Sequence, residues 1–114
     1  MSHAIRFHQT GGPEVLSYEA VSVGEPGPGE VRLRHTAIGI NFIDTYQRGG
    51  LYPVALPSGL GQEAAGVVDA VGSGVENVAV GDRVAYAGGP LGAYSTHRLI
   101  SANLLVKLPD GISD

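Results

Sequence analysis

The stretch GLGQEAAGVVDAVGSGV, residues 59–75, decides how the rest of the sequence is interpreted. It carries glycine at positions 59, 61, 66, 72 and 74 and almost no charge. Two structures use glycines at this density. One is a loop that cradles the phosphates of a nucleotide, and the other is a curved sheet whose backbone bends sharply or approaches a neighbour closely.

The phosphate-binding interpretation fails on sequence context. A dinucleotide fingerprint requires a strand, then Gly-x-Gly-x-x-Gly, then a helix whose amino terminus meets the pyrophosphate. The segment GSGVEN, residues 72–77, has the first two glycines but Asn77 at the third position. The residues that follow are β-branched and interrupted by Gly81, which disfavours a helix. Any nucleotide fingerprint is therefore expected outside residues 1–114.

The glycines fit a barrel better. Gly61 and Gly66 lie within or beside a predicted strand, where they allow a bend or a close approach of neighbouring backbone. Gly72 and Gly74 then serve a turn, and residues 73–83 form a crossing loop that leads into the next strand.

Composition indicates one globular domain with one core. The chain has 114 residues, of which 43% are hydrophobic and 16% charged, and no apolar run is long enough to span a bilayer. The net charge is -4, and the 7 Lys and Arg are scattered singly, so nucleic-acid binding is not expected. The first residues do not resemble a secretory signal, which predicts a cytoplasmic protein. The absence of cysteine excludes disulfides, thiolate nucleophiles and sulfur-ligated zinc.

Short β-leaning runs punctuated by 18 Gly and 7 Pro predict a mainly β fold, either a barrel or a sandwich. The run at 30–40 is the clearest, with Val31, Leu33 and His35 on one face. Residues 51–61 contain two prolines and are expected to form an ordered loop. The predicted strands are residues 3–9, 15–23, 30–40, 62–72, 83–89, 93–100 and 103–109.

One short helix of two turns is predicted at NFIDTYQRGG, residues 41–50. Asn41 can cap it, and Asp44 stands near the positive end of the helix dipole. Arg48 lies in the last turn, where its charge suits the helix carboxyl terminus, and Gly49 is expected to end the helix.

Five blocks of this chain, in this order and at this spacing, resemble the zinc-independent quinone oxidoreductases of the medium-chain dehydrogenase/reductase superfamily. The resemblance spans almost the whole chain. The blocks are GGPEVL (11–16), GINFIDTYQRGGLYP (39–53), LPSGLGQEAAGVVDAVGSGV (56–75), GDRVAY (81–86) and GAYSTHRLI (92–100).

The resemblance implies that residues 1–114 form the amino-terminal catalytic domain, a β-barrel resembling GroES. It implies a Rossmann nucleotide-binding domain after residue 114, so the chain is expected to be a fragment and inactive alone. In the family, this domain works with NADPH and transfers a hydride to a quinone or a similar conjugated carbonyl. A homodimer formed through the Rossmann domain is expected for the full-length protein.

A catalytic metal is not expected. The zinc-bearing alcohol dehydrogenases of the superfamily carry Cys at the position matching Asn41 and His at the position matching Gln62, and amides are poor zinc ligands. The 4 histidines share no metal-ligand spacing. Glu63 is expected to be buried and paired for structural reasons, for example with Arg83. Tyr86, Tyr94 and His97 are expected to be wall or core residues.

The predicted site lies on the short helix and the turn after it. Without a metal, hydrogen-bond donors must polarise the carbonyl that is reduced. The catalytic candidates are Asn41, Asp44, Tyr46 and Tyr52. The resemblance places the nicotinamide side of the cleft along Asn41, Phe42, Ile43, Asp44, Thr45 and Tyr46.

Each catalytic candidate also has a structural explanation. Asn41 can donate to a substrate oxygen or simply cap the helix, and Asp44 is favoured there by the helix dipole alone. Tyr46 and Tyr52 can stack on a flat quinone and donate to its oxygens, or their rings can seal the helix against the barrel.

Two other functions stay open. One is a free-standing small β-barrel that serves as a binding or assembly module. The other is a zinc-free enoyl or alkenal reductase of the same superfamily, which shares the fold and the cofactor. Residues that select NADPH over NADH belong to the expected Rossmann domain.

Overall fold

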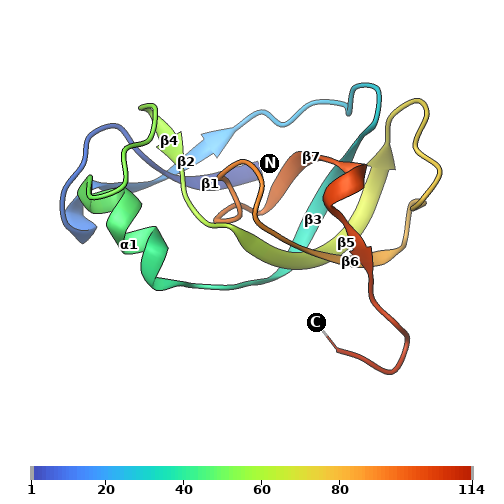
Figure 1. The fold of residues 1–114 in the computed structure, drawn as a ribbon. Helices are drawn as coiled ribbons and strands as arrows, with labels where there is room; N and C mark the ends of the chain where they lie inside the picture. Colours follow the sequence, from blue (N-terminus) through green and yellow to red (C-terminus); the bar gives the residue numbers. More distant parts are fainter. Residues whose placement is uncertain (1, 114) are drawn as a thin grey trace.

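The computed structural model describes residues 2–113, which form two antiparallel sheets, one α-helix and two turns of 3-10 helix (Figure 1). The larger sheet and the smaller sheet lie at opposite ends of the molecule, and α1 lies beside the smaller one. In chain order the elements are β1 (Ser2–Phe7), η1 (Pro13–Val15), β2 (Leu16–Val21), β3 (Glu30–Ile38), α1 (Phe42–Gly49), β4 (Ser58–Gly59), β5 (Glu63–Val71), β6 (Arg83–Ala87), β7 (His97–Ser101), η2 (Ala102–Leu104) and β8 (Val106–Lys107).

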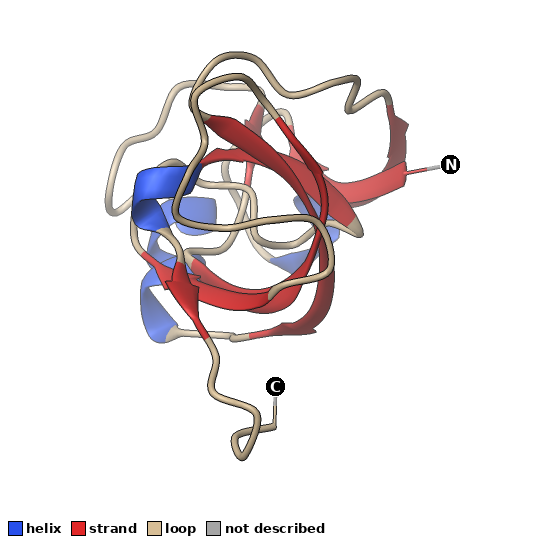
Figure 2. Ribbon diagram, turned by 90° about the vertical axis from the view of Figure 1, so that its right-hand side faces the viewer, coloured by secondary structure: helices blue, strands red, loops and turns tan. Residues whose placement is uncertain are grey.

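The smaller sheet has the order β2-β1-β4. β1 pairs along its whole length with β2, from Ser2 opposite Val21 to Phe7 opposite Leu16. The larger sheet has the order β7-β3-β5-β6-β8 and curves around a common interior (Figure 2). Within residues 2–113 an isolated bridge between Ala4 and Ser95 connects the two sheets, which otherwise remain separate ladders.

The core lies inside the curved larger sheet. Alternation along β3 buries Val31 and Leu33 completely and exposes Arg34, as the strand pattern predicts. Val68 of β5 and Val84 of β6 are also fully buried and belong to the same hydrophobic cluster. The described residues include no helix with the length and apolar character needed to cross a membrane.

Glycine in the deciding stretch has the structural role that the sequence predicts. A Cβ on Gly66 would collide with the carbonyl oxygen of Arg34 and lie 3.0 Å from the Cα of His35, so β5 approaches β3 as only glycine permits. The register between these strands shifts beside this point, between His35 and Ala37. Gly74 has a φ of 78° in the turn after β5, and no helix follows it.

Several predicted boundaries are wrong by a few residues. β2 begins at Leu16 because η1 occupies Pro13–Val15, and β7 begins at His97 because residues 93–96 are mostly bends. The predicted strand 103–109 is largely η2 and the two-residue β8. Inside the predicted loop 51–61, Ser58 and Gly59 pair with β1 as β4.

Candidate functional site

The amino terminus of α1 is fixed by a capping box between Asn41 and Asp44. Asn41 is the cap residue in extended conformation, and the Asp44 carboxylate accepts its backbone N–H at 3.1 Å. Asp44 is only 2% exposed. The predicted cap is therefore confirmed, and the Asp44 carboxylate lies inside the protein.

A second donor reaches Asp44 from a distant segment. The Tyr94 hydroxyl donates to Asp44 Oδ2 at 2.6 Å, whereas Oδ1 is buried and has no hydrogen-bond partner. Burial, and then the neighbouring carboxylate, raises the pKa of Tyr94 well above its usual range, so the phenol stays protonated as a donor. Sequence reasoning treated Tyr94 only as a wall or core residue, because its partner stands 50 positions away.

The carboxyl terminus of α1 is tied to the loop before η1. Gly50, with a φ of 91°, ends the helix in left-handed conformation, one residue after the predicted Gly49. Arg48 Nε donates to the Gly11 carbonyl at 3.2 Å, and the Gly11 N–H donates to the Arg48 carbonyl at 3.0 Å. Both ends of the helix are therefore anchored, which holds its exposed face in a defined position.

Tyr46 and Tyr52 meet across the Gly49–Gly50 turn. Their ring centroids are 5.8 Å apart at an interplanar angle of 73°, an edge-to-face contact, and the Tyr52 N–H donates to the Tyr46 carbonyl at 3.3 Å. The rings are 42% and 50% exposed. They pack on each other, and about half of each side chain faces solvent, so both rings are accessible from outside.

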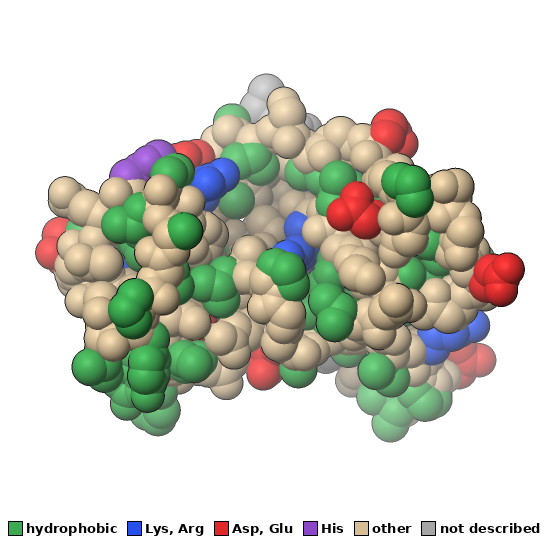
Figure 3. Space-filling model, turned by 45° about the horizontal axis from the view of Figure 1, so that its top comes forward, with side chains coloured by type: hydrophobic (Ala, Val, Ile, Leu, Met, Phe, Trp, Pro, Cys, Tyr) green, Lys and Arg blue, Asp and Glu red, His purple; other side chains and the backbone are tan. Residues whose placement is uncertain are grey.

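Exposed apolar side chains surround these tyrosines. We use the name helix surface for Ile40, Phe42, Tyr46, Leu51 and Tyr52, which are each between 42% and 83% exposed. Figure 3 shows hydrophobic side chains gathered at the end of the molecule that carries α1 in Figure 1. A monomeric surface rarely shows such large apolar groups side by side, which marks this region as a contact surface.

The remaining predicted site residues divide by exposure. Thr45 is exposed, although its hydroxyl already donates to the Phe42 carbonyl at 2.7 Å. Asn41 and Ile43 are half-buried. The structure thus brings Asn41, Tyr46 and Tyr52 to one end of the molecule with partly accessible side chains, and it withdraws Asp44 behind them.

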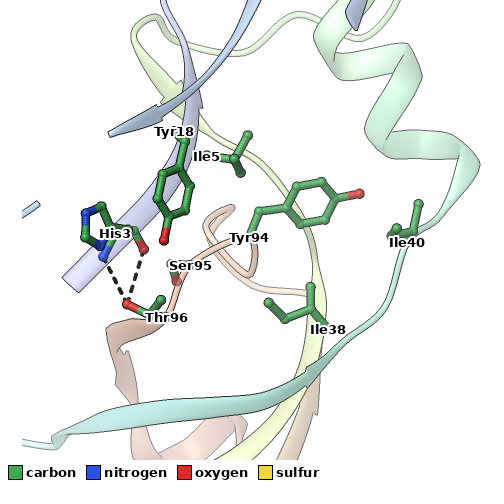
Figure 4. Close-up of a pocket in the computed structure, with 8 residues that line it drawn as sticks. All are labelled: His3, Ile5, Tyr18, Ile38, Ile40, Tyr94, Ser95 and Thr96. Atoms are coloured by element: carbon green, nitrogen blue, oxygen red, sulfur yellow. Dashed lines mark hydrogen bonds between the residues drawn. The ribbon is translucent and has the colours of Figure 1, made fainter. Parts of the chain in front are cut away.

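A cavity of about 310 Å³ lies on the inner side of this arrangement (Figure 4). Tyr94 points its ring across the cavity toward Ile40, while Tyr18 and His3 form the opposite wall as stacked rings 4.7 Å apart. Its lining residues are His3, Ile5, Tyr18, Ile38, Ile40, Tyr94, Ser95 and Thr96. Tyr94 therefore connects this cavity, through Asp44, to the start of α1.

The segments that match the zinc ligands of alcohol dehydrogenases lie next to each other. The Gly39 N–H donates to the Glu63 carbonyl at 3.1 Å, which sets the segment leading to Asn41 against the start of β5, one residue after Gln62. Within residues 2–113 no group of three His, Asp or Glu side chains is arranged to hold a metal ion. Glu63 is exposed, and in the β5–β6 ladder its backbone lies opposite Ala87. Arg83 lies at the other end of that ladder, opposite Val67, so the predicted burial of Glu63 and its pairing with Arg83 are wrong.

A polar network crosses the core beneath the cavity. Tyr86 is buried, and its hydroxyl lies 2.9 Å from Nε2 of His35, whose Nδ1 lies 2.8 Å from the Ser95 carbonyl. A carbonyl can only accept, so Nδ1 carries the proton and Nε2 accepts from Tyr86. Burial lowers the pKa of His35, with a smaller contribution from the Arg98 charge.

The family model described as Alcohol dehydrogenase GroES-like domain matches residues 27–110. Quinone oxidoreductase of Pseudomonas aeruginosa is 61% identical over 98% of this chain, and 2-haloacrylate reductase of Burkholderia sp is 50% identical over 96% of it. The crystal structure of Escherichia coli quinone oxidoreductase complexed with NADPH superposes with a TM-score of 0.94 at 53% identity over 97% of this chain. These findings confirm the predicted mainly β, GroES-like fold and the resemblance to quinone oxidoreductases.

The chain spans about a third of the length of these relatives. It covers 35% of the P. aeruginosa protein, 34% of the Burkholderia protein and 34% of the E. coli structure.

Proposed function

The chain belongs to the alcohol dehydrogenase GroES-like domain family, and from this membership we propose that it is the catalytic domain of a zinc-independent, NADPH-dependent quinone oxidoreductase. The proposal includes a Rossmann domain outside residues 1–114 that binds most of the NADPH. A cytoplasmic location and a homodimer of the full-length protein stay predictions.

The helix surface is the observation that carries the proposal. Tyr46 and Tyr52 are exposed and in edge-to-face contact. Phe42, which is 83% exposed, lies one helical turn before Tyr46 on the same side of α1. Flat aromatic faces beside phenol hydroxyls suit a planar acceptor with oxygens at its rim. The anchoring of α1 at both ends supplies the fixed geometry that such a site needs.

The described residues fit one end of NADPH and not the other. Residues 72–82 form turns and loop instead of a strand–turn–helix, so they give no place for a pyrophosphate. The amino terminus of α1 carries the Asp44 carboxylate, which accepts the Asn41 backbone N–H. The negative charge of this carboxylate repels a phosphate from the start of the helix. The helix surface, in contrast, offers apolar contact for a nicotinamide ring around Phe42 and Tyr46.

We assign the roles of this chain's residues as follows. Bound NADPH supplies the hydride. Because the rings of Tyr46 and Tyr52 stand at 73° to each other, one ring stacks on the acceptor while the other meets its edge. Their hydroxyls donate to the acceptor oxygens as negative charge develops there. The Asn41 amide donates to an acceptor oxygen from the start of the helix. Asp44 is a positioning residue, because it is buried and binds Asn41 and Tyr94.

A second candidate function is reduction of a conjugated carbonyl other than a quinone. The similarity to a protein named 2-haloacrylate reductase favours it, since the activated double bond in that name differs from a quinone. An enone or an acrylate carries its oxygen atoms at one end of the conjugated system, whereas 1,4-benzoquinone carries one oxygen at each end. Donors at one position then suffice, so the two functions differ in how many tyrosine hydroxyls they need.

The test is steady-state NADPH oxidation by the product of the complete reading frame, with 1,4-benzoquinone, 2-cyclohexenone and 2-chloroacrylate as acceptors. We expect the highest kcat/KM for benzoquinone. Loss of one hydroxyl, in Tyr46→Phe or Tyr52→Phe, should lower kcat/KM by roughly 10- to 150-fold, since one hydrogen bond to developing charge is worth about 1.5–3 kcal/mol. Tyr18→Phe is the matched control, because Tyr18 belongs to β2 outside the helix surface and the substitution keeps the ring that lines the 310 Å³ cavity.

Failure of benzoquinone reduction with a retained rate for chloroacrylate would replace the first function by the second. Equal activity of all four proteins would contradict the assigned roles of both tyrosines.

A further inference from the structure

A second cavity, of about 370 Å³, lies between the two sheets and away from the helix surface. Arg6 of β1 enters it from one sheet and Arg98 of β7 from the other. Figure 3 shows a face that is hollowed between the two ends of the molecule, with Lys or Arg side chains on both sides of the hollow. The lining residues are Ala4, Arg6, Val21, Val23, Gly59, Leu91, Gly92, Ser95, His97, Arg98 and Leu99.

No carboxylate lines this cavity. Two acidic groups belong to neighbouring strands, and both are engaged. Asp69 accepts from Arg32 at 2.7 Å and lies 3.9 Å from His97, and Glu19 lies 2.7 Å from His8. Neither arginine of the cavity forms an ion pair with a carboxylate among residues 2–113, although Glu19 on the neighbouring β2 is near enough to Arg6 for the two charges to interact. The lining itself therefore holds two positive charges and no negative one.

The two guanidinium groups are not equally free. Arg98 is held in place, because Nη1 donates to the Tyr86 hydroxyl at 3.3 Å, Nη2 donates to the Pro90 carbonyl at 3.2 Å and Cζ lies 5.4 Å from the Tyr86 ring centroid. Arg6 Nε is buried and has no hydrogen-bond partner. A buried donor without a partner destabilises the folded protein, so an acceptor placed beside Arg6 Nε would be favoured.

The other walls select the chemistry of the acceptor. The Gly92 N–H already donates to the Gly61 carbonyl, and the Ser95 hydroxyl donates to the Gly92 carbonyl. The side-chain donors left are the two guanidinium groups and the His97 ring, and the remaining lining is mostly aliphatic. A planar carboxylate matches the guanidinium fork with both oxygens, and an apolar body next to it suits these walls. A phosphate dianion needs more donors and is more costly to remove from water.

We propose that the cavity between Arg6 and Arg98 is a binding site for a carboxylate attached to a small apolar body. The carboxylate comes either from a free small molecule or from an acidic residue of polypeptide outside residues 1–114. The site is independent of the proposed oxidoreductase function and uses none of the helix surface.

The experiment follows the Nε–Hε signals of the arginines in ¹H–¹⁵N spectra during titration with sodium benzoate. Sodium phosphate and sodium chloride at equal ionic strength serve as comparison salts. We expect saturable benzoate shifts at Arg6 and Arg98, weaker phosphate shifts and no saturable chloride shift. Arg6→Gln should weaken benzoate binding at least 10-fold, and Arg34→Gln, at an exposed arginine of β3 outside the cavity, should leave it unchanged.

The two sources are separated by repeating the titration on the product of the complete reading frame. Benzoate shifts there indicate a free ligand. An Arg6 signal already at its shifted position, and insensitive to benzoate, indicates a carboxylate of the polypeptide. Equal effects of chloride and benzoate, tighter binding of phosphate, or unchanged binding in Arg6→Gln would each overturn the proposal, and the wild-type spectra decide it even if that variant does not fold.

Discussion

The Tyr94→Phe substitution tests whether a buried hydrogen bond holds the start of α1. It removes the hydroxyl that donates to Asp44 Oδ2 at 2.6 Å and keeps the ring that lines the cavity. A hydrogen bond to a charged group contributes about 1.5–3 kcal/mol to stability. The upper half of that range applies here, because Asp44 is 2% exposed and its Oδ1 has no partner to compensate.

The expected loss is therefore about 2–3 kcal/mol, which corresponds to a fall of roughly 8–12 °C in Tm for a domain of this size. Urea unfolding followed by circular dichroism measures the free energy of unfolding directly. Tyr18→Phe is the matched control, since Tyr18 is 66% exposed, and it should change stability by no more than about 0.5 kcal/mol.

A double-mutant cycle assigns the loss to the charged partner. In an Asp44→Asn background the acceptor is neutral, so the same Tyr94→Phe change should cost only about 1 kcal/mol. The pH dependence gives an independent check. The pKa of Tyr94 is raised in the folded state. The Tyr94 hydroxyl therefore contributes fully to the free energy of unfolding below about pH 10, where tyrosine in the unfolded chain is still protonated, and this contribution declines as the pH rises further. A loss below about 1 kcal/mol, or an equal loss in both backgrounds, would refute this reasoning.

The remaining predictions concern the sheet and the core. Gly66→Ala should lower the free energy of unfolding by about 3 kcal/mol, because the added methyl group collides with the backbone of Arg34, which is held in the sheet. Gly111→Ala is the control: the space around Gly111 is open, so the same urea unfolding experiment should show little change. The pKa of His35 is lowered in the folded state, so neutral His35 should contribute fully to the free energy of unfolding above about pH 6.5. That contribution should be lost as the pH falls through the pKa of His35 in the folded protein. An NMR titration in which His35 protonates at or above its ordinary pKa would contradict the buried imidazole that accepts from Tyr86.

The sequence predicted those features that depend on local patterns. The alternation of residue types predicted the buried face of β3. Asn41 as a cap and Arg48 in the last turn predicted the limits of α1 to within one residue. Gly66 predicted the close contact between β5 and β3. Its errors have a common cause. The hydrogen bonds of the strands and the exposure of Glu63 depend on register between distant segments, which no local pattern specifies.

The Asp44–Tyr94 pair shows what this limit means for the site. A carboxylate three residues after a cap satisfies local rules, so local pattern alone does not separate a positioning role from a chemical one. Only the fold brings Tyr94 to Asp44 and buries the charge.

With Asp44 buried, the donors of the proposed site are neutral, namely the Asn41 amide at the start of α1 and the hydroxyls of Tyr46 and Tyr52. A localised alkoxide requires more stabilisation than a negative charge dispersed over conjugated atoms, and a metal ion supplies more of it than neutral hydrogen-bond donors do. Under the proposed function, we therefore expect this site to favour acceptors that delocalise the incoming electrons over conjugated atoms and to disfavour simple ketones.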